Sequence, residues 1–437
     1  MRDAIIFLLI FSTIPFILKR PVVGTLTYAV VGLMNPHRLA YGAAYDFPFA
    51  MVLCVITLIS LLISREEKKI PMTGAVVALL VFIAWTSFTA LFAQEPALAW
   101  LEWQRVMKTM LMVVLTILTV RTVKDLKALV LVVVLSLGFW GFKGGIFTIL
   151  SGGTSRVLGP AGSYISDNNT LALAMITIVP LMFSLVTLAH TKWQKRAAMA
   201  LAFLTIAAAL GSYSRGAMLG GAGMLFFLWL KSKAKVTTGL AILVLAPVVF
   251  ALMPEQWTGR MESIDNYQED ASAMGRINAW RFAMNVAADL PTGGGFGVFT
   301  PRMFQFYAPE PQRFYVAHSI YFQVLGDHGY FGLLLYLLLF LFAWRTGSRT
   351  IRYCAGKPDL AWAAKLAQMC QVSMIGFMMA GAFLSMPYYD LIYYIIAILV
   401  TLEKVLILAP QPDDTAPMKV PFLDRFFASK PAQRRPG

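Results

Sequence analysis

The sequence has little charge and few cysteines. Only 14% of its 437 residues are charged, whereas 58% are hydrophobic. A chain of this composition has too little polar surface to enclose a water-soluble core, so it must place apolar surface against lipid. The three cysteines, Cys54, Cys354 and Cys370, are odd in number and scattered. They support neither a disulfide framework nor a zinc site.

Long apolar stretches recur along the whole chain. A helix needs about 20 apolar residues to cross a bilayer, because its backbone polar groups must be satisfied internally. The predicted spans are Phe47–Ser64, Thr73–Phe92, Arg105–Val120, Leu126–Leu150, Leu171–Ala189, Ala197–Leu210, Ala217–Leu230, Thr238–Met253, His318–Ala343, Ala363–Leu384 and Leu391–Leu408. We therefore predict an all-α, polytopic membrane helix bundle.

Two shorter apolar stretches, Ala4–Leu18 and Val22–Met34, come first and are separated by Lys19-Arg20-Pro21. They are either two thin spans or one broken unit, which gives about twelve or thirteen spans in all. Thirteen alternating spans put the N-terminus outside, and merging the first two puts it inside. The first stretch has no small-residue cleavage site, so we predict an uncleaved anchor instead of a signal peptide.

The basic loops set the orientation, because cytoplasmic loops retain lysine and arginine. These loops are Arg65–Lys69, Arg121–Lys127, Lys192–Arg196, Lys231–Lys235, Arg345–Lys357 and the tail segment Arg425–Arg435. This assignment places on the opposite side the loops Gln94–Gln104 and Ser151–Asn169, the Tyr213–Arg215 turn and a polar insert, Pro254–Ala317. The proline-rich and charged tail, 410–437, is predicted to be a flexible cytoplasmic end.

The formal net charge of +15 could suggest a nucleic-acid partner. Most of the excess, however, lies in short loops beside predicted membrane ends. We attribute it to orientation and to attraction for anionic lipid headgroups, and expect no nucleic-acid partner.

The polar insert 254–317 divides the chain into an N-terminal bundle, 1–253, and C-terminal helices, 318–409. It contains five arginines, namely Arg260, Arg276, Arg281, Arg302 and Arg313. A long loop can be translocated regardless of its charge, but arginines gathered on the outer side call for an anionic partner there. Four acidic residues of the insert, Glu262, Asp265, Glu269 and Asp270, could bind a divalent cation, although a solvated loop face explains them too.

Arg215 interrupts an apolar run, with Gly211 before it and Gly216 after it. A guanidinium is costly near hydrocarbon and usually faces a partner, although it could also snorkel from a helix end. Flanking glycines would let a bulky ligand approach the backbone. Arginine also suits phosphate, because its planar fork donates two parallel hydrogen bonds and stays charged.

The segment Met274–Met284 has helical character and places Arg276 and Trp280 one turn apart on one face. Such a helix could hold Arg276 at the height of a lipid pyrophosphate while Trp280 anchors at the interface, or it could be merely interfacial. The glycine-rich Pro291–Gly297 that follows has no βαβ context, so it is not a dinucleotide fingerprint. We predict a sharply turned loop with closely approached backbone.

His318 and His328 are the two histidines near the insert. Ten residues correspond to about 15 Å along a continuous helix, so the two should neither form a dyad nor share a metal. His318 follows the insert directly and would stand where substrates meet. Its neutral imidazole is a competent general base for a sugar hydroxyl. His328 is the second candidate, and a plain helix-start role is the alternative for His318.

In their order, these motifs resemble the bacterial O-antigen ligase and polymerase superfamily. The resemblance rests on Ser214-Arg215-Gly216-Ala217, Arg276 with Trp280, Gly293–Gly297, and His318-Ser319 followed by Gly329 and Gly332, and it covers roughly Asn168–Ala343. Asn168 and the sequence Asn35-Pro36-His37-Arg38 also resemble ligase-like members. Members of the superfamily often have an asparagine directly after the histidine, whereas this chain has Ser319 there.

The resemblance implies a GT-C-like fold and glycosyl transfer at the periplasmic face of the bacterial inner membrane, with no cofactor or metal. The donor would be a glycan on undecaprenyl pyrophosphate, and the acceptor a sugar hydroxyl of lipid A core. Arg215 and Arg276 would bind the pyrophosphate and His318 would deprotonate the acceptor, with Trp280, Asn168 and Arg281 in support. A single displacement would invert the anomeric carbon.

Three other functions stay open. An O-antigen polymerase would join two lipid-linked repeats, and a protein O-glycosylation ligase would use a protein hydroxyl. A lipid or solute transporter would also have about twelve spans, but it should show repeats of topology, and we see none.

Overall fold

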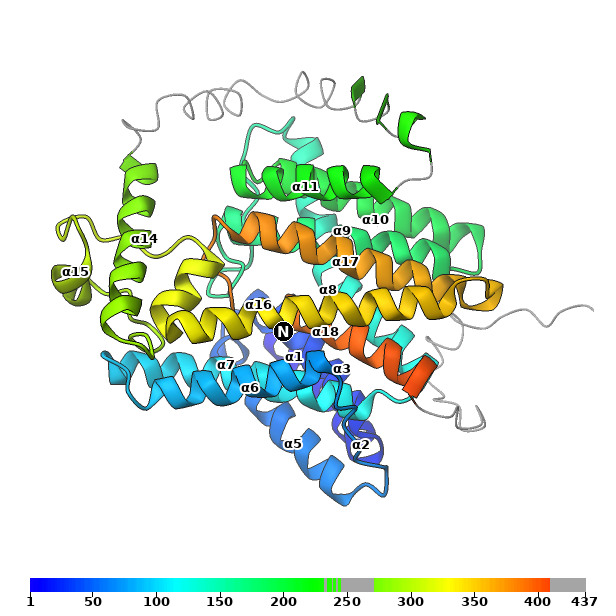
Figure 1. Cartoon of the computed structure of the whole chain (residues 1–437). Coiled ribbons are helices and arrows are strands. Elements are labelled where there is room, and N and C mark those ends of the chain that lie inside the picture. Colours follow the sequence, from blue (N-terminus) through cyan, green and yellow to red (C-terminus); the bar gives the residue numbers. More distant parts are fainter. Residues whose placement is uncertain (232–233, 238, 241–242, 245–270, 409–437) are drawn as a thin grey trace, which may run out of the picture.

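The computed structural model describes residues 1–231, 234–237, 239–240, 243–244 and 271–408 (Figure 1). Over these residues the chain is helical and has no strand, which confirms the all-α prediction. The elements are α1 (Arg2–Phe11), α2 (Ile14–Lys19), α3 (Pro21–Met34), η1 (Pro36–Leu39), α4 (Ala43–Asp46), α5 (Phe49–Ile63), α6 (Gly74–Ala90), α7 (Pro96–Thr119), α8 (Val123–Leu150), α9 (Asn168–Leu188), α10 (Lys192–Leu210), α11 (Arg215–Lys231), α14 (Ala271–Asp289), α15 (Pro301–Tyr307), α16 (Ile320–Cys354), η2 (Pro358–Leu360), α17 (Ala361–Gly381), α18 (Asp390–Glu403) and η3 (Lys404–Leu408).

Four of these helices are long and apolar enough to cross a membrane: α8, α9, α16 and the continuous Asp390–Leu408. Three shorter apolar helices, α3, α5 and α6, coincide with predicted spans. The protein is thus a helical membrane protein, and the count of twelve or thirteen spans stays a prediction. The predicted span Thr238–Met253 lies largely outside the described residues.

Three predicted boundaries were wrong. The expected loop Gln94–Gln104 is mostly helix, because Pro96 starts α7 at its first position, where a missing N–H costs nothing. His318 lies before its helix instead of in it, since Ser319 caps α16 and accepts from Phe322 N. α16 also continues past the predicted end at Ala343 to Cys354.

The N-terminal stretch forms two short helices, α1 and α2, followed by the separate helix α3. α1 and α2 meet at Ser12-Thr13, and Pro21 starts α3. Near the start of the chain, Asp3 Oδ1 accepts from the backbone N–H groups of Gly42 (3.1 Å) and Ala44 (2.9 Å). At the α2–α3 junction, Arg20 pairs with Asp125 at 3.2 Å. The N-terminus therefore lies at the η1 end of α3, and the α2–α3 junction lies at the other end.

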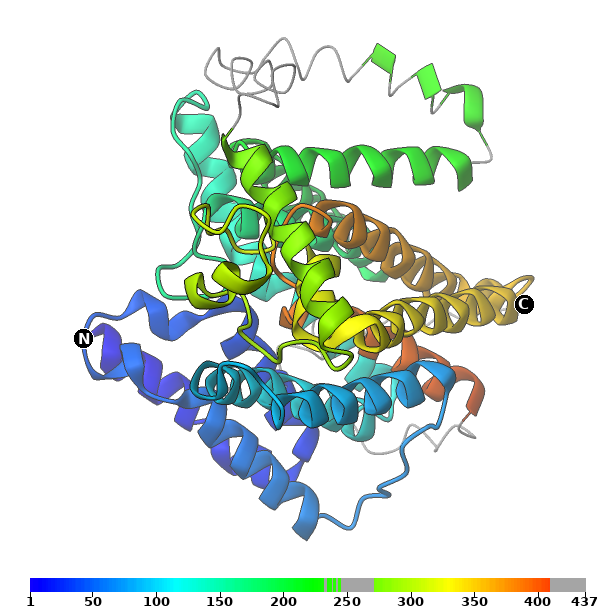
Figure 2. The ribbon, with the colours of Figure 1, turned by 60° about the vertical axis from the view of Figure 1, so that its left-hand side comes forward.

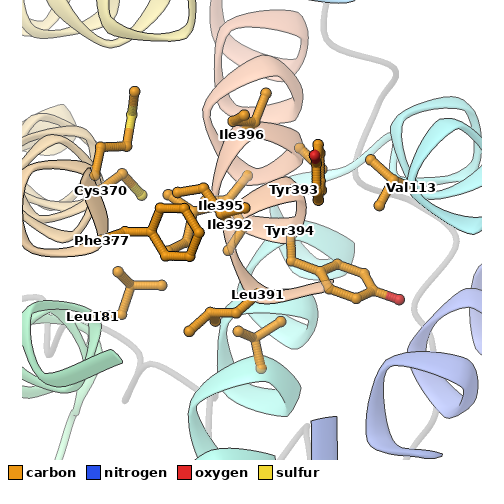
Figure 3. Packing of buried hydrophobic residues seen from close by; sticks show 14 of the residues in the cluster. Val113, Leu181, Cys370, Phe377, Leu391, Ile392, Tyr393, Tyr394, Ile395 and Ile396 are labelled. Carbon is orange, nitrogen blue, oxygen red and sulfur yellow. The ribbon is translucent and has the colours of Figure 1, made fainter. Parts of the chain in front are cut away.

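α18 is the centre of the bundle, and every residue from Leu391 to Glu403 is buried. Figure 3 shows Tyr393, Tyr394 and the neighbouring isoleucines between Phe377 of α17, Leu181 of α9 and Val113 of α7. A helix that is apolar all round must be covered on every side. Because lipid is as apolar as these side chains, close van der Waals packing holds the helices together in the membrane.

The other helices form two flanks around this centre. α9 packs on α8, α10 and α17, and α11 packs on α17. On the opposite flank, α3 packs on α5 and α8, while α6 packs on α16. Figures 1 and 2 show α10 and α11 on one side of α16–α18 and the helices α1 to α7 on the other.

Two predicted basic loops meet at one end of the bundle, which we call the basic end. Arg121 lies 3.7 Å from Glu66 and also donates to the carbonyl of Glu67, so two of these loops meet. Lys404 Nζ donates to three carbonyls at the end of α7, at 2.8–3.2 Å. A lysine there satisfies carbonyls that have no helical partner.

Candidate functional site

The opposite end of the bundle, which we call the site end, holds the turn before Arg215. Asn168 Nδ2 donates to the carbonyl of Ser212 at 2.8 Å, so the start of α9 supports this turn. Tyr213 has a φ of 58°, and Ser214 Oγ then accepts from Ala217 N at 3.3 Å. This left-handed residue followed by a serine cap reverses the chain between α10 and α11.

Arg215 is the first residue of α11. The N-terminal end of a helix carries partial positive charge, so it attracts an anion and disfavours a cation. The half-buried guanidinium adds to that positive potential instead of offsetting it. The arrangement is suited to a phosphate or pyrophosphate group.

Trp280 connects α14 to the segment that holds His318. The indole Nε1 donates to the carbonyl of Ala317 at 2.8 Å. The ring stacks on Phe322 of α16, with centroids 4.9 Å apart and planes 11° apart. Trp280 thus orients the residue before His318, a role beyond the membrane anchoring that the sequence indicated.

Asn278 is a positioning residue that the sequence reasoning missed. Its Nδ2 donates to the carbonyls of Glu310 and Arg313, both at 2.9 Å, and its Oδ1 accepts from Glu310 N at 3.0 Å. The side chain is buried, so these bonds hold the returning loop against α14. Asparagine is unfavourable inside a helix. Its occurrence between Arg276 and Trp280 could therefore have indicated that this side chain has a role.

His318 stands at a strained point of the backbone, with a φ of 42°. Burial lowers its pKa below the ordinary histidine value, the cation of Arg276 lowers it further, and the carboxylate of Asp167 opposes them. His318 is therefore neutral at pH 7 and lies within electrostatic reach of both residues. A neutral imidazole can accept a proton.

Four elements therefore converge at the site end. Asp167 and Asn168 start α9, and Asn168 supports the turn that leads to Arg215. Asp167 and Arg276 both act on His318. The structure thus brings the start of α9, the start of α11, α14 and the segment before α16 to one place.

Phe383, two residues after the end of α17, lies beside this arrangement. Its Cβ would lie 3.8 Å from a Cβ built on Gly216, which is an ordinary van der Waals contact. Its ring centroid is 6.5 Å from that of Trp280. Phe383 therefore lies near both Gly216 and Trp280, the neighbours of Arg215 and Arg276, and no periodic pattern in the sequence indicates it.

His328, the second histidine candidate, is fully buried. Its Nδ1 lies 2.7 Å from Thr89 Oγ1, and its carbonyl accepts from Trp85 Nε1 at 3.0 Å. The Phe296 ring packs edge-on against it, with centroids 4.4 Å apart. His328 is thus enclosed by its neighbours, whereas His318 is half-buried and the charges of Arg276 and Asp167 act on its pKa.

The glycine-rich loop has the closely approached backbone that the sequence predicted. Gly294 N and Gly295 N donate to the carbonyls of Gly326 and Asp327, both at 2.8 Å. Gly329 breaks the helical path of α16 with a φ of 69°. A Cβ on Gly293 would lie 2.5 Å from Gly329 N, so only glycine fits. The loop is therefore seated on the break in α16.

Three described arginines of the insert, Arg281, Arg302 and Arg313, have separate surroundings. Arg281 is exposed, Arg302 lies 3.6 Å from Glu95, and Arg313 lies 3.4 Å from Glu310. Arg260 lies outside the described residues, as do the acidic residues considered for a cation site, Glu262, Asp265, Glu269 and Asp270. Within the described ranges no three His, Cys, Asp or Glu side chains cluster as metal ligands would.

The fold and this arrangement define a helical membrane protein with a polar, arginine-containing site at one end of its bundle. Residues 200–337 match the model of the family described as O-Antigen ligase, and residues 1–190 match a family of unknown function (DUF5935). This match supports membership of the O-antigen ligase family for the part of the chain that it covers. No curated protein matches it. The ligase match contains Arg215, Arg276 and His318, whereas Asn168 lies in the other matched region.

Proposed function

We propose that the protein is an O-antigen ligase of the bacterial inner membrane, with its active site facing the periplasm. It transfers a glycan as one block from undecaprenyl pyrophosphate to a sugar hydroxyl of lipid A core. Three observations support this proposal: Arg276 and Asp167 both affect the pKa of His318, Asn168 beside Asp167 supports the turn before Arg215, and the family match covers Arg215, Arg276 and His318.

The two arginines stabilise the leaving group. As the acceptor oxygen bonds to the anomeric carbon, the bond from that carbon to the pyrophosphate oxygen breaks and its electron pair stays on the pyrophosphate. The growing negative charge needs fixed cations more than it needs an acid. Arg276 offers a bidentate fork, and Arg215 combines its charge with the N-terminus of α11.

His318 takes the proton of the attacking hydroxyl. Its lowered pKa keeps the imidazole in the accepting form at neutral pH. General-base catalysis of this kind contributes roughly 10²–10⁴-fold in rate. One displacement with attack opposite the leaving group inverts the anomeric configuration, and no cofactor or metal enters this step.

Reconstituted transfer tests the proposal. Purified protein with a lipid-linked glycan and lipid A core should transfer the glycan, and it should do so equally in a chelator. Arg276→Lys keeps the charge but loses the fork, so transfer should fall by about 10²-fold or more, a typical effect of losing one transition-state donor. Arg302→Lys, on the same insert but 67% exposed, should be near wild type.

The acceptor separates the related functions. Transfer only to a second lipid-linked repeat would make the protein a polymerase, and transfer only to a protein hydroxyl would make it a protein ligase. If Arg276→Lys and His318→Ala both transferred glycan at the wild-type rate, the assigned mechanism would be wrong. Movement of the lipid-linked glycan across vesicles without any transfer would instead indicate a transporter.

A further inference from the structure

A polar cavity of about 320 Å³ lies in the region that matches the family of unknown function and in the adjoining α18 start. Its wall includes three cations, Arg38, Arg105 and Lys108, and a single carboxylate, Asp390. Neither of the arginines proposed for transfer lines it, and neither does His318. The cavity therefore has a separate chemistry with an excess of positive charge.

The cations and their neighbours offer unused hydrogen-bond donors. Lys108 makes no hydrogen bond or ion pair with any described residue. Arg38 Nε and His37 Nδ1 are buried and hydrogen-bond to no described atom. Arg105 lies over the Tyr164 ring at 4.3 Å and donates to its hydroxyl at 3.0 Å, which fixes the guanidinium at the wall.

The nearby carboxylates neutralise only part of this charge. Asp46 lies 3.4 Å from Arg38 but is 89% exposed, and it does not line the cavity. Glu102 pairs with Arg105 and likewise does not line the cavity. Asp390, inside the wall, accepts from Thr109 at 2.9 Å. Lys108 thus has no carboxylate of its own.

An apolar groove of about 380 Å³ adjoins this cavity. α1 and α3 form most of it, with Ile6, Ile10 and Val30 among its lining residues. Val31 lines both the groove and the cavity, and Pro36 lines the groove beside His37 of the cavity. The charged and the apolar spaces therefore meet along one face of α3.

We propose that the cavity and the groove together bind an anionic phospholipid. Its phosphate is held by Arg38, Arg105 and Lys108, and one acyl chain lies along α1 and α3. Arginine forks and a lysine ammonium match phosphate oxygens, while a hydrocarbon chain matches the groove. Zwitterionic lipids carry a cation that the three basic residues repel. A free phosphate would use the cavity alone.

Lipid binding to the full-length protein tests this proposal without measuring transfer. Detergent-purified protein is titrated with phosphatidylglycerol or phosphatidylcholine of equal chain length, and the bound lipid is counted by native mass spectrometry. The wild type should prefer phosphatidylglycerol. Lys108→Met and Arg38→Gln should each weaken its binding about fivefold and leave phosphatidylcholine unchanged. Val30→Trp should weaken both lipids, because it fills the groove.

Matched controls and opposite outcomes make the test decisive. Lys124→Met, an exposed lysine outside the cavity, and Leu62→Trp, an exposed side chain outside the groove, should bind both lipids as the wild type does. Lys108→Arg keeps the charge and should keep the preference. The proposal is overturned if the Arg38→Gln, Lys108→Met double variant retains the preference, if Val30→Trp binds normally, or if equimolar inorganic phosphate displaces the lipid.

Discussion

At the residue scale, burial and the nearby charges set the protonation state that the proposed role of His318 requires. Burial and Arg276 both disfavour the imidazolium, and Asp167 partly restores it. A base works best when its pKa is near the working pH and its proton-accepting form is populated. Burial and Arg276 populate the proton-accepting form of His318, whereas Asp167 raises its pKa again toward the working pH.

The pH dependence of transfer follows from these signs. The active form of His318 is unprotonated and its pKa is lowered, so transfer should persist below the ordinary histidine pKa and fall as the pH drops through the lowered value. Asp167→Asn removes the charge that raises this pKa, so the acidic limb should move to lower pH. Asparagine can still cap α9. The midpoint of the rate–pH profile is the measurement.

Asp289→Asn is the control for this experiment. It removes an exposed carboxylate at the end of α14 that does not act on the pKa of His318. Its midpoint should equal that of the wild type. A midpoint that stays fixed or rises in Asp167→Asn would mean that His318 is not the group that titrates.

At the scale of elements, the break in α16 is the feature that positions the glycine loop. A Pro291–Gly297 loop could pass so close only to a helix whose own backbone turns away, and Gly329 supplies that turn. Asp327, just before the break, accepts from Tyr388 Oη at 2.9 Å. The loop, the break and the segment before α18 therefore form one packed unit.

Replacement of Gly293 should destabilise this unit. Alanine at Gly293 would combine an unfavourable φ of 72° with a contact of 2.5 Å to Gly329 N. Gly152 has a similar φ of 59° but nothing within 4 Å of its built Cβ. Gly152→Ala should cost about 1 kcal/mol from the backbone alone, and Gly293→Ala should cost at least twice that. Thermal unfolding in detergent measures both, and equal losses would contradict the steric argument.

At the scale of the whole molecule, the two ends of the bundle differ in composition. The loop 151–167 meets the α10–α11 turn, since Val157 N donates to the carbonyl of Gly211 at 3.0 Å. Gln94 N likewise donates to the carbonyl of Gly294 at 2.8 Å, at the site end. Predicted outer loops thus meet one another, and two predicted basic loops meet at the basic end.

Labelling from one side of the membrane tests this arrangement. In a variant without native cysteines, single cysteines at Arg2 and Ser155 should react with a membrane-impermeant maleimide added to spheroplasts. A cysteine at Gly356, near the basic end, should react only after lysis. Labelling of Arg2→Cys only after lysis would contradict a broken first pass with its N-terminus at the site end.

The candidate residues for the chemistry could be predicted from the sequence. Arg215, Arg276 and His318 stand out because charge is scarce in an apolar chain, and the spacing of Arg276 and Trp280 indicated a shared helix face. Asn278 and Phe383 could not be found in that way. Their roles depend on a loop and a helix that return from 32 or more residues away, which no local pattern encodes.

The sequence by itself determined that the protein is a helical membrane bundle, because backbone groups in lipid must be satisfied within each segment and only long apolar helices do so. It also indicated Arg215, Arg276 and His318 as the candidates for the chemistry. Only the tertiary structure decided that the starts of α9 and α11, the helix α14 and His318 meet at one end. It likewise decided that His328 is enclosed and that a cationic cavity adjoins an apolar groove at α3. These facts depend on helix packing, in which the energy of each contact is set by residues far apart in the chain.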